Sequence, residues 1–340
     1  MDYRNINVLI WDIDGVLIYV RESYREAIVE SAKYYMKELM GIKTESSLLS
    51  VEDTQRFKMA EGFNDDWKLT YAFVLCLLAK AVSKNRSLLA INESPADLPG
   101  KLDLLKKAGA MASDTDLSID YEKIVSEVKT AGVGLEGVEK ALVNIFGAGC
   151  VEAAKRIWLT DVIKQVFQEM YLGTDLYEKK YGAAPRFFKR PGLIRHEHPI
   201  VSLKTLEKLS ERFVMGVASG RERFEAEFSL KEYGFDAFIP LEYAVTSEDV
   251  SHGKPDPESL LLCQKKIVRA GKLSCGPVGA VYIGDSVDDI RAAKNAGFFS
   301  VGCLSASMGV EEKRRLRAEF QKLKCDMIVN DANHLAVWVR

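Results

Sequence analysis

The stretch VLIWDIDGVL, residues 8–17, carries the strongest structural signal in this sequence. Four apolar residues with strand propensity run directly into Asp12, Asp14 follows two residues later, and Gly15 then interrupts the pattern. Such a run predicts a buried strand that ends at Asp12. Carboxylates at the end of a buried strand are costly unless positive charge lies beside them. Either a cation or basic group faces this strand end, or the strand interpretation is wrong.

The composition is typical of a globular chain with a sizeable core. Its 340 residues, 47% of them hydrophobic, suffice for one large or two ordinary domains. A net charge of −2, with Lys and Arg spread along the chain, argues against disorder and against a nucleic-acid partner. The six cysteines lack metal-binding spacing, so reduced core thiols are expected at Cys76, Cys150, Cys263, Cys275, Cys303 and Cys325.

The chain is expected to be soluble and cytoplasmic, without a membrane partner. The first strand begins almost at the N-terminus, so no signal peptide is expected. The most apolar window, residues 71–82, is too short to span a bilayer and contains Lys80. This window therefore predicts a buried helix.

Hydrophobic periodicity divides the chain into a split α/β domain and a helical insertion. From residue 22 to about 184 apolar residues recur at helical spacing, as in residues 22–39 and 151–170, and SVED at Ser50 and SIDY at Ser118 predict helix starts. Later segments alternate helices with short apolar runs of strand length at 212–219, 235–240, 279–285, 298–303 and 325–330. This alternation predicts a parallel sheet with helices on both faces. The expected domains are a core of residues 1–20 and 187–340 and an inserted all-helical domain of residues 21–186.

Polar residues end three of the predicted strands: Asp12, Ser219 before Gly220, and Asp285 after Gly284. Each of these residues alone is a weak indication of function, because an acid or a Ser-Gly pair at a strand end is typical of turns and helix caps. In open parallel sheets, however, ligands bind beyond the carboxyl ends of the strands. Crowded carboxylates there need a cation, and an all-oxygen ligand set suits Mg²⁺, which can neutralise phosphoryl oxygens.

Two further groups suit an anionic ligand at these strand ends. Ser219 and the backbone N–H groups after it offer donors at a helix N-terminus. Lys254 lies between Gly253 and Pro255 in HGKPDP, a rigid loop that presents a single cation. A lone lysine is usually a solvated surface residue, but the acid-rich strand ends make Lys254 a candidate for the active site.

Four ordered motifs of this chain resemble those of the haloacid dehalogenase-like hydrolases: DIDGV at 12–16, VASGR at 217–221, GKPDP at 253–257 and GDSVDD at 284–289. The resemblance covers the whole chain outside the insertion. It implies a Rossmann-like core and Mg²⁺-dependent phosphoryl transfer through an aspartyl-phosphate. The insertion is similar to the helical cap of the family's first cap class, as in phosphoglycolate-phosphatase-like members, although it is longer than usual.

The resemblance also implies roles for the motif residues. Asp12 matches the nucleophile and a metal ligand, and Asp14 matches the general acid/base, with its backbone carbonyl as a metal ligand. Ser219 and the Gly220 amide would hold the phosphoryl group, and Lys254 would stabilise charge on that group and on Asp12. The remaining metal-site residues would be Asp285 and Asp289. Asp289 would act through water or on Lys254, and it is a better match for this position than its neighbour Asp288.

Several other activities share this core. A dehalogenase would not need Asp14, because a halide leaves without a proton. A phosphonate hydrolase needs a cap lysine that forms a Schiff base, and no lysine, Lys58 included, is singled out. A sugar-phosphate mutase shares every core motif, whereas a catalytically silent binding protein would have lost at least one. The predicted function is therefore hydrolysis of a small phosphorylated metabolite, with phosphoglycolate, sugar phosphates and histidinol phosphate all open as substrates.

Specificity is expected to come from the insertion. In EGFNDDW, residues 61–67, Asn64 and Trp67 are assigned to substrate binding; a helix–helix turn capped by Asn64 or Asp65 is the alternative. In RESYRE, residues 21–26, Arg21 is assigned to the substrate anion, with surface charge on a helix as the alternative.

Two further segments complete the candidate residues. Arg221, directly after Gly220, is also assigned to substrate binding. His196 and His198 have a spacing that suits metal contact from a strand, but their segment matches the return from insertion to core, so a solvated loop is expected at residues 195–199.

Overall fold

The chain folds into two compact units. The computed structural model describes residues 6–58, 63, 66–112, 115–271, 279–306 and 309–339. The core unit comprises residues 1–20 and 197–340, and the helical unit comprises residues 21–196. The prediction for Cys275 lies outside the described residues, and the other five cysteines are free thiols. No helix in the described part of the chain combines the length and apolarity that crossing a bilayer requires.

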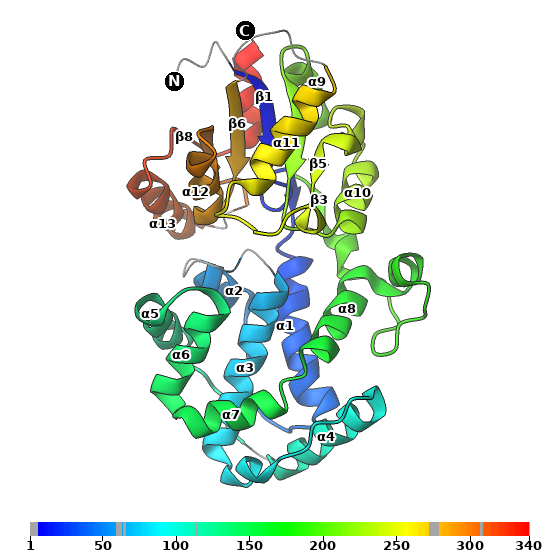
Figure 1. The fold of residues 1–340 in the computed structure, drawn as a ribbon, viewed down its shortest axis with the longest axis vertical. Helices are drawn as coiled ribbons and strands as arrows, with labels where there is room; N and C mark the ends of the chain where they lie inside the picture. The colour runs from blue at the N-terminus through cyan, green and yellow to red at the C-terminus, as the bar shows by residue number, and fades with distance from the viewer. Residues whose placement is uncertain are drawn as a thin grey trace. The chain divides into compact units, whose positions relative to one another are not determined.

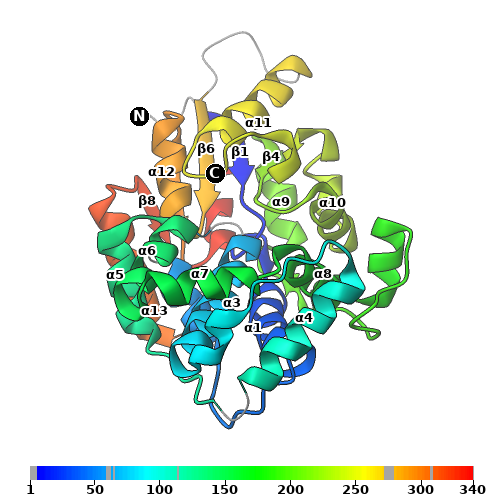
Figure 2. The ribbon, with the colours of Figure 1, turned by 60° about the horizontal axis from the view of Figure 1, so that its bottom comes forward.

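A six-stranded parallel sheet forms the centre of the core unit (Figure 1). Its strand order is β5-β4-β1-β6-β7-β8, so the opening strand β1 (Ile6–Trp11) lies between β4 (Val214–Ala218) and β6 (Gly279–Gly284). The other strands are β5 (Ala244–Val245), β7 (Phe299–Cys303) and β8 (Met327–Val329). Figure 2 shows β6, β1 and β4 side by side from a second direction. The central place of β1 explains its unbroken apolar run, because both its faces are buried.

Helices cover both faces of this sheet. On one face, Ile10 and Tyr282 pack with residues of α11 (Glu258–Arg269) and α12 (Val287–Asn295). On the other face, the ring of Phe299 lies 6.4 Å from that of Trp338 in the 3₁₀-helix η8 (Ala332–Val339), which packs against α9 (Leu203–Ser210). The remaining helical segments are α10 (Arg223–Glu232), α13 (Gly309–Lys322), η5 (Phe235–Ala237), η6 (Leu241–Tyr243) and η7 (Ser247–Asp249). The predicted fold class, a Rossmann-like α/β core with an inserted helical unit, is confirmed.

One predicted strand is wrong. Residues 235–240 form the short 3₁₀-helix η5 and a turn, and the edge strand β5 follows at residues 244–245. Phe235 and Ile239 are buried while Asp236 and Ala237 between them are exposed, and this spacing suits a helical turn rather than a strand. Hydrophobicity alone did not separate the two structures in so short a run.

The helical unit consists of eight α-helices and three shorter helical segments within its described residues. They are α1 (Tyr24–Tyr34), the π-helical turn η2 (Tyr35–Leu39), α2 (Val51–Lys58), α3 (Asp66–Lys84), η3 (Arg86–Ala90), α4 (Leu98–Met111), α5 (Tyr121–Ala131), α6 (Gly134–Phe146), α7 (Ala148–Arg156), α8 (Thr160–Tyr181) and η4 (Leu193–His196). The apolar window at 71–82 lies in α3, where most of its side chains are fully buried. The rings of Phe57, Phe73 and Tyr121 pack together, joining α2, α3 and α5.

Several predicted helix boundaries shift. The helix expected over residues 22–39 is α1 followed by one π turn, in which the Tyr35 hydroxyl donates to the Ile157 carbonyl and accepts from the Leu159 N–H. These bonds satisfy backbone groups at the break between α7 and α8, so residues 151–170 form two helices rather than one. The N-cap of α5 is Asp120 rather than Ser118, and its carboxylate accepts from the Lys123 N–H. Ser50 caps α2 as predicted, through bonds with Asp53.

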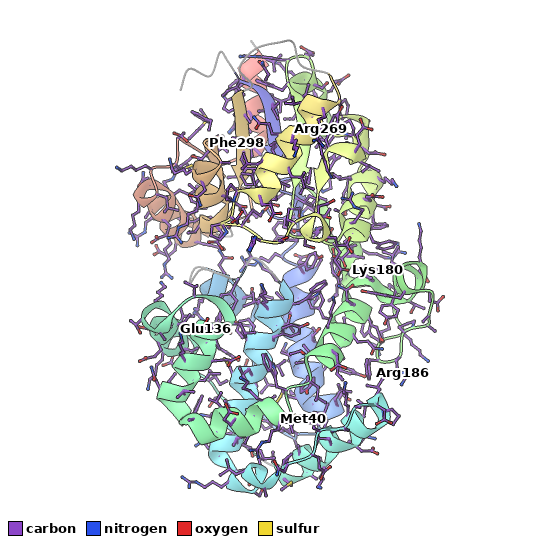
Figure 3. The ribbon with its side chains drawn as sticks, viewed as in Figure 1. Met40, Glu136, Lys180, Arg186, Arg269 and Phe298 are labelled. Carbon is purple, nitrogen blue, oxygen red and sulfur yellow. The ribbon has the colours of Figure 1, made fainter. Side chains whose placement is uncertain are left out.

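The helical unit ends at residue 196, ten residues later than the predicted 186, because a buried carboxylate ties the following segment to α8. Glu169 accepts hydrogen bonds from the backbone N–H groups of Arg186, Phe187 and Phe188, at 2.5–2.9 Å. Arg186, labelled in Figure 3, lies in the segment that follows α8. Pro191 also bridges to the backbone of Gly173, where α8 departs from helical geometry. These contacts place residues 187–196 with the helices.

We predict that Glu169→Gln lowers the free energy of unfolding by about 1–3 kcal/mol. The amide has one acceptor oxygen instead of two, and its NH₂ group would face backbone donors in a buried position. Chemical denaturation of the purified variant measures the change. Glu178→Gln, an exposed carboxylate on the same helix, is the control and should change little. Equal changes for the two variants would contradict the role given to Glu169.

Candidate active site

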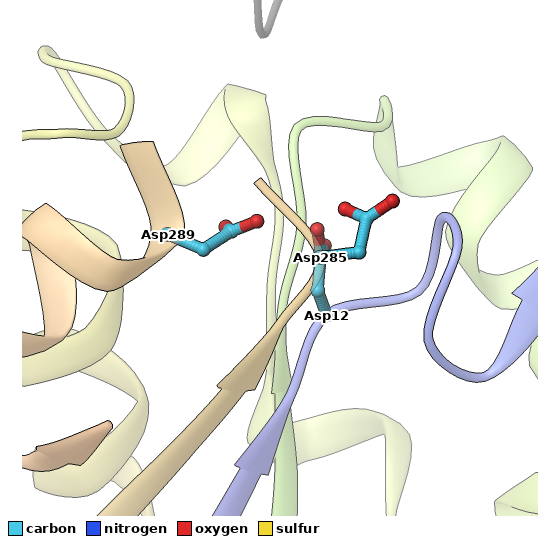
Figure 4. Close-up of side chains that lie close together, drawn as sticks. All are labelled: Asp12, Asp285 and Asp289. Atoms are coloured by element: carbon cyan, nitrogen blue, oxygen red, sulfur yellow. The ribbon is translucent and has the colours of Figure 1, made fainter. Parts of the chain in front are cut away.

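The site begins at Asp12, the first residue after β1. Its backbone N–H continues the sheet by donating to the Ile283 carbonyl of β6 at 2.9 Å. The carboxylate is 6% exposed, and one oxygen, Oδ1, accepts from the N–H of Ile13 at 2.9 Å. Figure 4 shows this carboxylate beside those of Asp285, directly after β6, and Asp289 in α12. The neighbouring parallel strands β1 and β6 therefore deliver their acids to the same end of the sheet.

Gly15 allows the chain to turn directly over these acids. Its φ of +75° lies in the left-handed region, and its N–H donates to the Ile18 carbonyl at 2.8 Å. A Cβ atom at this position would lie 2.0 Å from Oδ2 of Asp285. Both the conformation and the close approach thus require glycine, which explains the break in the sequence pattern after Asp14.

Lys254 supplies positive charge to the acidic strand ends. Its ammonium Nζ lies 3.1 Å from Oδ2 of Asp12 and 2.7 Å from Oδ1 of Asp289, and the side chain is 7% exposed. Carboxylate oxygens of Asp12, Asp285 and Asp289 all lie within 4.8 Å of one another. The structure thus brings together four residues that the sequence analysis assigned to one site.

Asp289 is held by the start of its own helix and by the lysine. Oδ2 accepts from the backbone N–H and the hydroxyl of Ser286, the N-cap of α12, at 2.9 and 2.6 Å. Oδ1 faces Lys254. With both oxygens engaged, this carboxylate is better placed to fix the lysine than to bind a metal directly. This is the second of the two roles predicted for Asp289.

Burial and mutual repulsion shift the pKa values of these groups. Burial, together with the nearby carboxylates, raises the pKa of Asp12 well above its ordinary value, although Lys254 opposes the shift. Burial also acts to lower the pKa of Lys254, but the charges of Asp12 and Asp289 dominate and raise it. For Asp289, the lysine and the bonds from Ser286 outweigh burial and lower the pKa. The lysine therefore stays charged, and Asp12 needs additional positive charge to be fully ionised.

The residues fit a divalent cation by charge and by donor chemistry. When they are ionised, the three carboxylates of the cluster outnumber its one ammonium, and a divalent cation would balance the excess negative charge. Carboxylate oxygens are the ligands that Mg²⁺ prefers. Asp12 and Asp285 are the carboxylates that would hold such an ion.

Two contributors to the site were missed by the sequence analysis. The hydroxyl of Tyr282, on β6, accepts from Lys254 Nζ at 2.9 Å and lies 3.1 Å from both the Ala218 carbonyl and Oδ1 of Asp289. The sequence signal that could have identified Tyr282 is its phenol group within a strand of otherwise aliphatic residues. The other is Glu197, between two histidines, whose carboxylate is fully buried.

Arg221 lies inside the core unit, and substrate contact by this residue stays a prediction. Its guanidinium is 1% exposed and bonds to the carboxylates of Asp14 and Glu197. Ser219 and Gly220 end the adjacent strand β4 as expected; Ser219 is buried, and its hydroxyl accepts from the Arg221 N–H at 3.3 Å.

The predicted substrate-binding residues of the helical unit have partners within that unit. Arg21 forms an ion pair with Glu52 at 3.0 Å, and Lys164 of α8 places Nζ 3.5 Å from the ring centroid of Trp67, in the first turn of α3. Asn64 lies outside the described residues, and so does Asp65. Substrate contact by these residues stays a prediction.

Both histidines are exposed, as predicted, but their segment forms a helical turn and a short strand rather than a loop. His196 ends η4, and its Nδ1 lies 3.2 Å from the Glu22 carbonyl. His198 belongs to the two-residue strand β3 (His198–Pro199), which pairs with β2 (Ile18–Tyr19), and its ring stacks on that of Tyr19 at 4.7 Å. Within the described residues, neither histidine belongs to a cluster of potential metal ligands.

Comparison with known proteins finds a family that is similar to part of the chain. Residues 169–303 match the family model described as haloacid dehalogenase-like hydrolase. The matched range contains Ser219, Lys254, Asp285 and Asp289, and the structure adds Asp12 at the same strand ends. Over this range the chain is similar to the haloacid dehalogenase-like hydrolases.

Individual relatives match parts of the chain. Pyrophosphatase PpaX of Bacillus velezensis is 34% identical over 29% of this chain and 43% of its own length. Phosphonoacetaldehyde hydrolase of Bacillus cereus is 28% identical over 46% of this chain and 57% of its own. The chain thus spans about half the length of these curated relatives. The solved phosphatase Tt82 from Thermococcus thioreducens has a TM-score of 0.50 and 28% identity, over 85% of this chain and 87% of that one.

We predict that Gly15→Ala lowers activity about 10- to 100-fold, because the new methyl group would displace Asp285 from its position beside Asp12. Strain at positive φ should also cost about 1–2 kcal/mol of stability. Gly41→Ala is the matched control: Gly41 has a φ of +74°, and a Cβ atom added there would meet nothing within 4 Å. Both variants should lose similar stability, but only Gly15→Ala should lose activity. Parallel losses of activity would contradict the steric explanation.

Proposed function

We propose that this chain is a phosphoric monoester hydrolase that forms an aspartyl-phosphate on Asp12 and acts on a small phosphorylated metabolite. The observation that carries the proposal is the placement of the Asp12 carboxylate. It lies at the end of a central strand, 3.1 Å from Lys254 Nζ and beside a second strand end that carries Asp285. Such an arrangement suits a carboxylate nucleophile that attacks an anionic phosphoryl group.

The reaction has two steps with balanced proton transfers. An oxygen of Asp12 bonds to phosphorus as the ester P–O bond breaks, and Asp14 gives its proton to the leaving oxygen. A water molecule then loses a proton to Asp14 and bonds to the same phosphorus as the bond between phosphorus and the Asp12 oxygen breaks, which releases phosphate and restores both aspartates. Lys254 and the N–H groups after Ser219 stabilise the negative charge of the phosphoryl oxygens throughout.

Mg²⁺ is the proposed cofactor, held by Asp12 and Asp285 with the backbone carbonyl of Asp14. When bound, it supplies positive charge that stabilises a phosphoryl group in transfer. Charge balance supports this choice, because the cluster keeps an excess of negative charge after Lys254 is counted. Asp289 contributes by holding Lys254 in place.

The names of the similar proteins support phosphoryl chemistry without fixing a substrate. One is a pyrophosphatase and another a phosphatase. A phosphonate hydrolase would use the same core with an additional lysine, and a sugar-phosphate mutase would also use this core. Screening phosphorylated metabolites, an alkyl phosphonate and a sugar phosphate for released phosphate or isomerised product separates these activities.

We predict that Asp12→Asn lowers phosphate release by about 10³-fold or more with any ester, since the amide keeps the shape and removes the nucleophile. Phosphate release from p-nitrophenyl phosphate with Mg²⁺ measures the effect, and mass spectrometry of quenched wild-type protein should find phosphate on Asp12. EDTA should abolish wild-type turnover, and added Mg²⁺ should restore it. Near-normal turnover by Asp12→Asn would overturn the mechanism.

We predict that Asp14→Asn slows the first step more for an alkyl phosphate than for p-nitrophenyl phosphate. An alkoxide needs a proton as it leaves, whereas nitrophenolate hardly does, and general acid catalysis contributes about 10²–10⁴-fold. Single-turnover phosphorylation with each ester gives the two losses. Equal losses with both esters would argue against Asp14 as the acid.

A further inference from the structure

A buried arginine connects the predicted general acid to a second, fully buried carboxylate. Arg221 donates from Nε and Nη2 to Oδ1 of Asp14, at 2.9 and 2.6 Å. Its Nη1 and Nη2 donate to the two carboxylate oxygens of Glu197, at 3.1 and 3.0 Å. The exposed fractions of the side chains are 1% for Arg221, 0% for Glu197 and 23% for Asp14. Of these three side chains, only that of Asp14 is partly exposed to solvent.

Glu197 alone is sufficient to neutralise the arginine. The two carboxylate oxygens accept from two guanidinium nitrogens, which is the bidentate geometry that gives an arginine–carboxylate pair its strength and direction. The hydroxyl of Ser229, in α10, accepts a further bond from Nη1 at 2.6 Å. The pair with Glu197 therefore accounts for the burial of the charge, and the two bonds to Asp14 require a separate explanation.

The bonds to Asp14 fix the orientation of its carboxylate. Both end on Oδ1, which leaves Oδ2 as the oxygen that can carry a proton. Oδ1 can accept hydrogen bonds both when Asp14 is a neutral acid with its proton on Oδ2 and when it is ionised. The arginine can thus hold the same orientation while Asp14 gives up a proton and while it takes one back.

Glu197 and its surroundings form a rigid base for the arginine. Glu197 is the first residue of the core unit after the helical unit, and the Tyr233 hydroxyl donates to its backbone carbonyl at 2.7 Å. The following strand β3 pairs with β2, which begins four residues after Asp14. Supporting contacts of this kind set the position of a reacting group to within fractions of an ångström.

We propose that Arg221 is a positioning residue that orients the Asp14 carboxylate for proton transfer, and that Glu197 holds Arg221 in place. This role rests on the proposed phosphatase mechanism. Because the guanidinium bonds to the proposed acid and the proposed nucleophile pairs with Lys254 instead, Arg221 acts on the reaction through Asp14.

The test is a double-mutant cycle between Arg221 and the acid it orients. Arg221→Lys keeps the charge but cannot bridge two carboxylates with a planar fork. It should slow single-turnover phosphorylation by an alkyl phosphate about tenfold, and by p-nitrophenyl phosphate about twofold or less. In the Asp14→Asn background the same substitution should change either rate by less than about twofold, because no acid remains to be positioned.

Two further variants separate positioning from general damage. Arg223→Lys, two residues along the chain, replaces a partly exposed arginine paired with Asp249, and should leave the ratio of the two ester rates unchanged. If Arg221→Lys does not fold, Glu197→Gln is the substitute variant, because it loosens the hold on Arg221 without removing the arginine. We expect Glu197→Gln to slow phosphorylation by the alkyl ester selectively, and to have no such effect in the Asp14→Asn background.

Each outcome decides for or against the role of Arg221. The role of Arg221 would be overturned if Arg221→Lys slowed phosphorylation equally with both esters, or slowed it as much in the Asp14→Asn background. In that case, turnover by the wild-type protein would leave the phosphatase mechanism intact. Wild-type protein that releases phosphate from no ester would overturn the phosphatase mechanism, and the role of Arg221 with it. A selective loss that disappears without Asp14 supports the proposal.

Discussion

The site depends on the balance of charge at the carboxyl end of two neighbouring strands. β1 and β6 are hydrogen-bonded side by side, so Asp12 and Asp285 emerge at the same edge of the sheet, and α12 adds Asp289. Acids this buried and this close are costly without compensation. Lys254 supplies part of it, and its ammonium is fixed in turn by Asp289 and the Tyr282 hydroxyl. The remaining negative charge makes this edge a favourable place for a divalent cation and, beside it, a phosphoryl group.

The two acids of the opening motif have different partners, although only one residue separates them. Asp12 faces Lys254, whereas Asp14 faces Arg221 and through it Glu197. The turn at Gly15 redirects the chain directly after them. Separate partners give a nucleophile and a proton donor independent surroundings, which the proposed mechanism requires, because one carboxylate must stay ionised while the other changes its protonation state.

The helical unit is stabilised by its own interior. α3 is buried around most of its circumference, aromatic rings join it to α2 and α5, and Glu169 binds the segment after α8. Trp67 and Arg21, assigned to substrate binding, each have a charged partner within this unit. These contacts add to the packing of the helical unit itself.

The sequence by itself determined the strand and turn at residues 8–17, the alternating α/β pattern, the helical insertion and the core motifs, because these depend on local periodicity and on residues that chemistry permits at few positions. It could not decide the form of residues 235–240, where a short apolar run suits a strand and a 3₁₀ turn equally. It also could not separate Arg221 from a substrate-binding arginine, or find Glu197 and Tyr282. Glu197 lies 24 residues from its partner Arg221 in the sequence, and Tyr282 lies 28 residues from its partner Lys254. Only the tertiary structure sets contacts over such separations, because they follow from the packing of strands and helices rather than from local pattern.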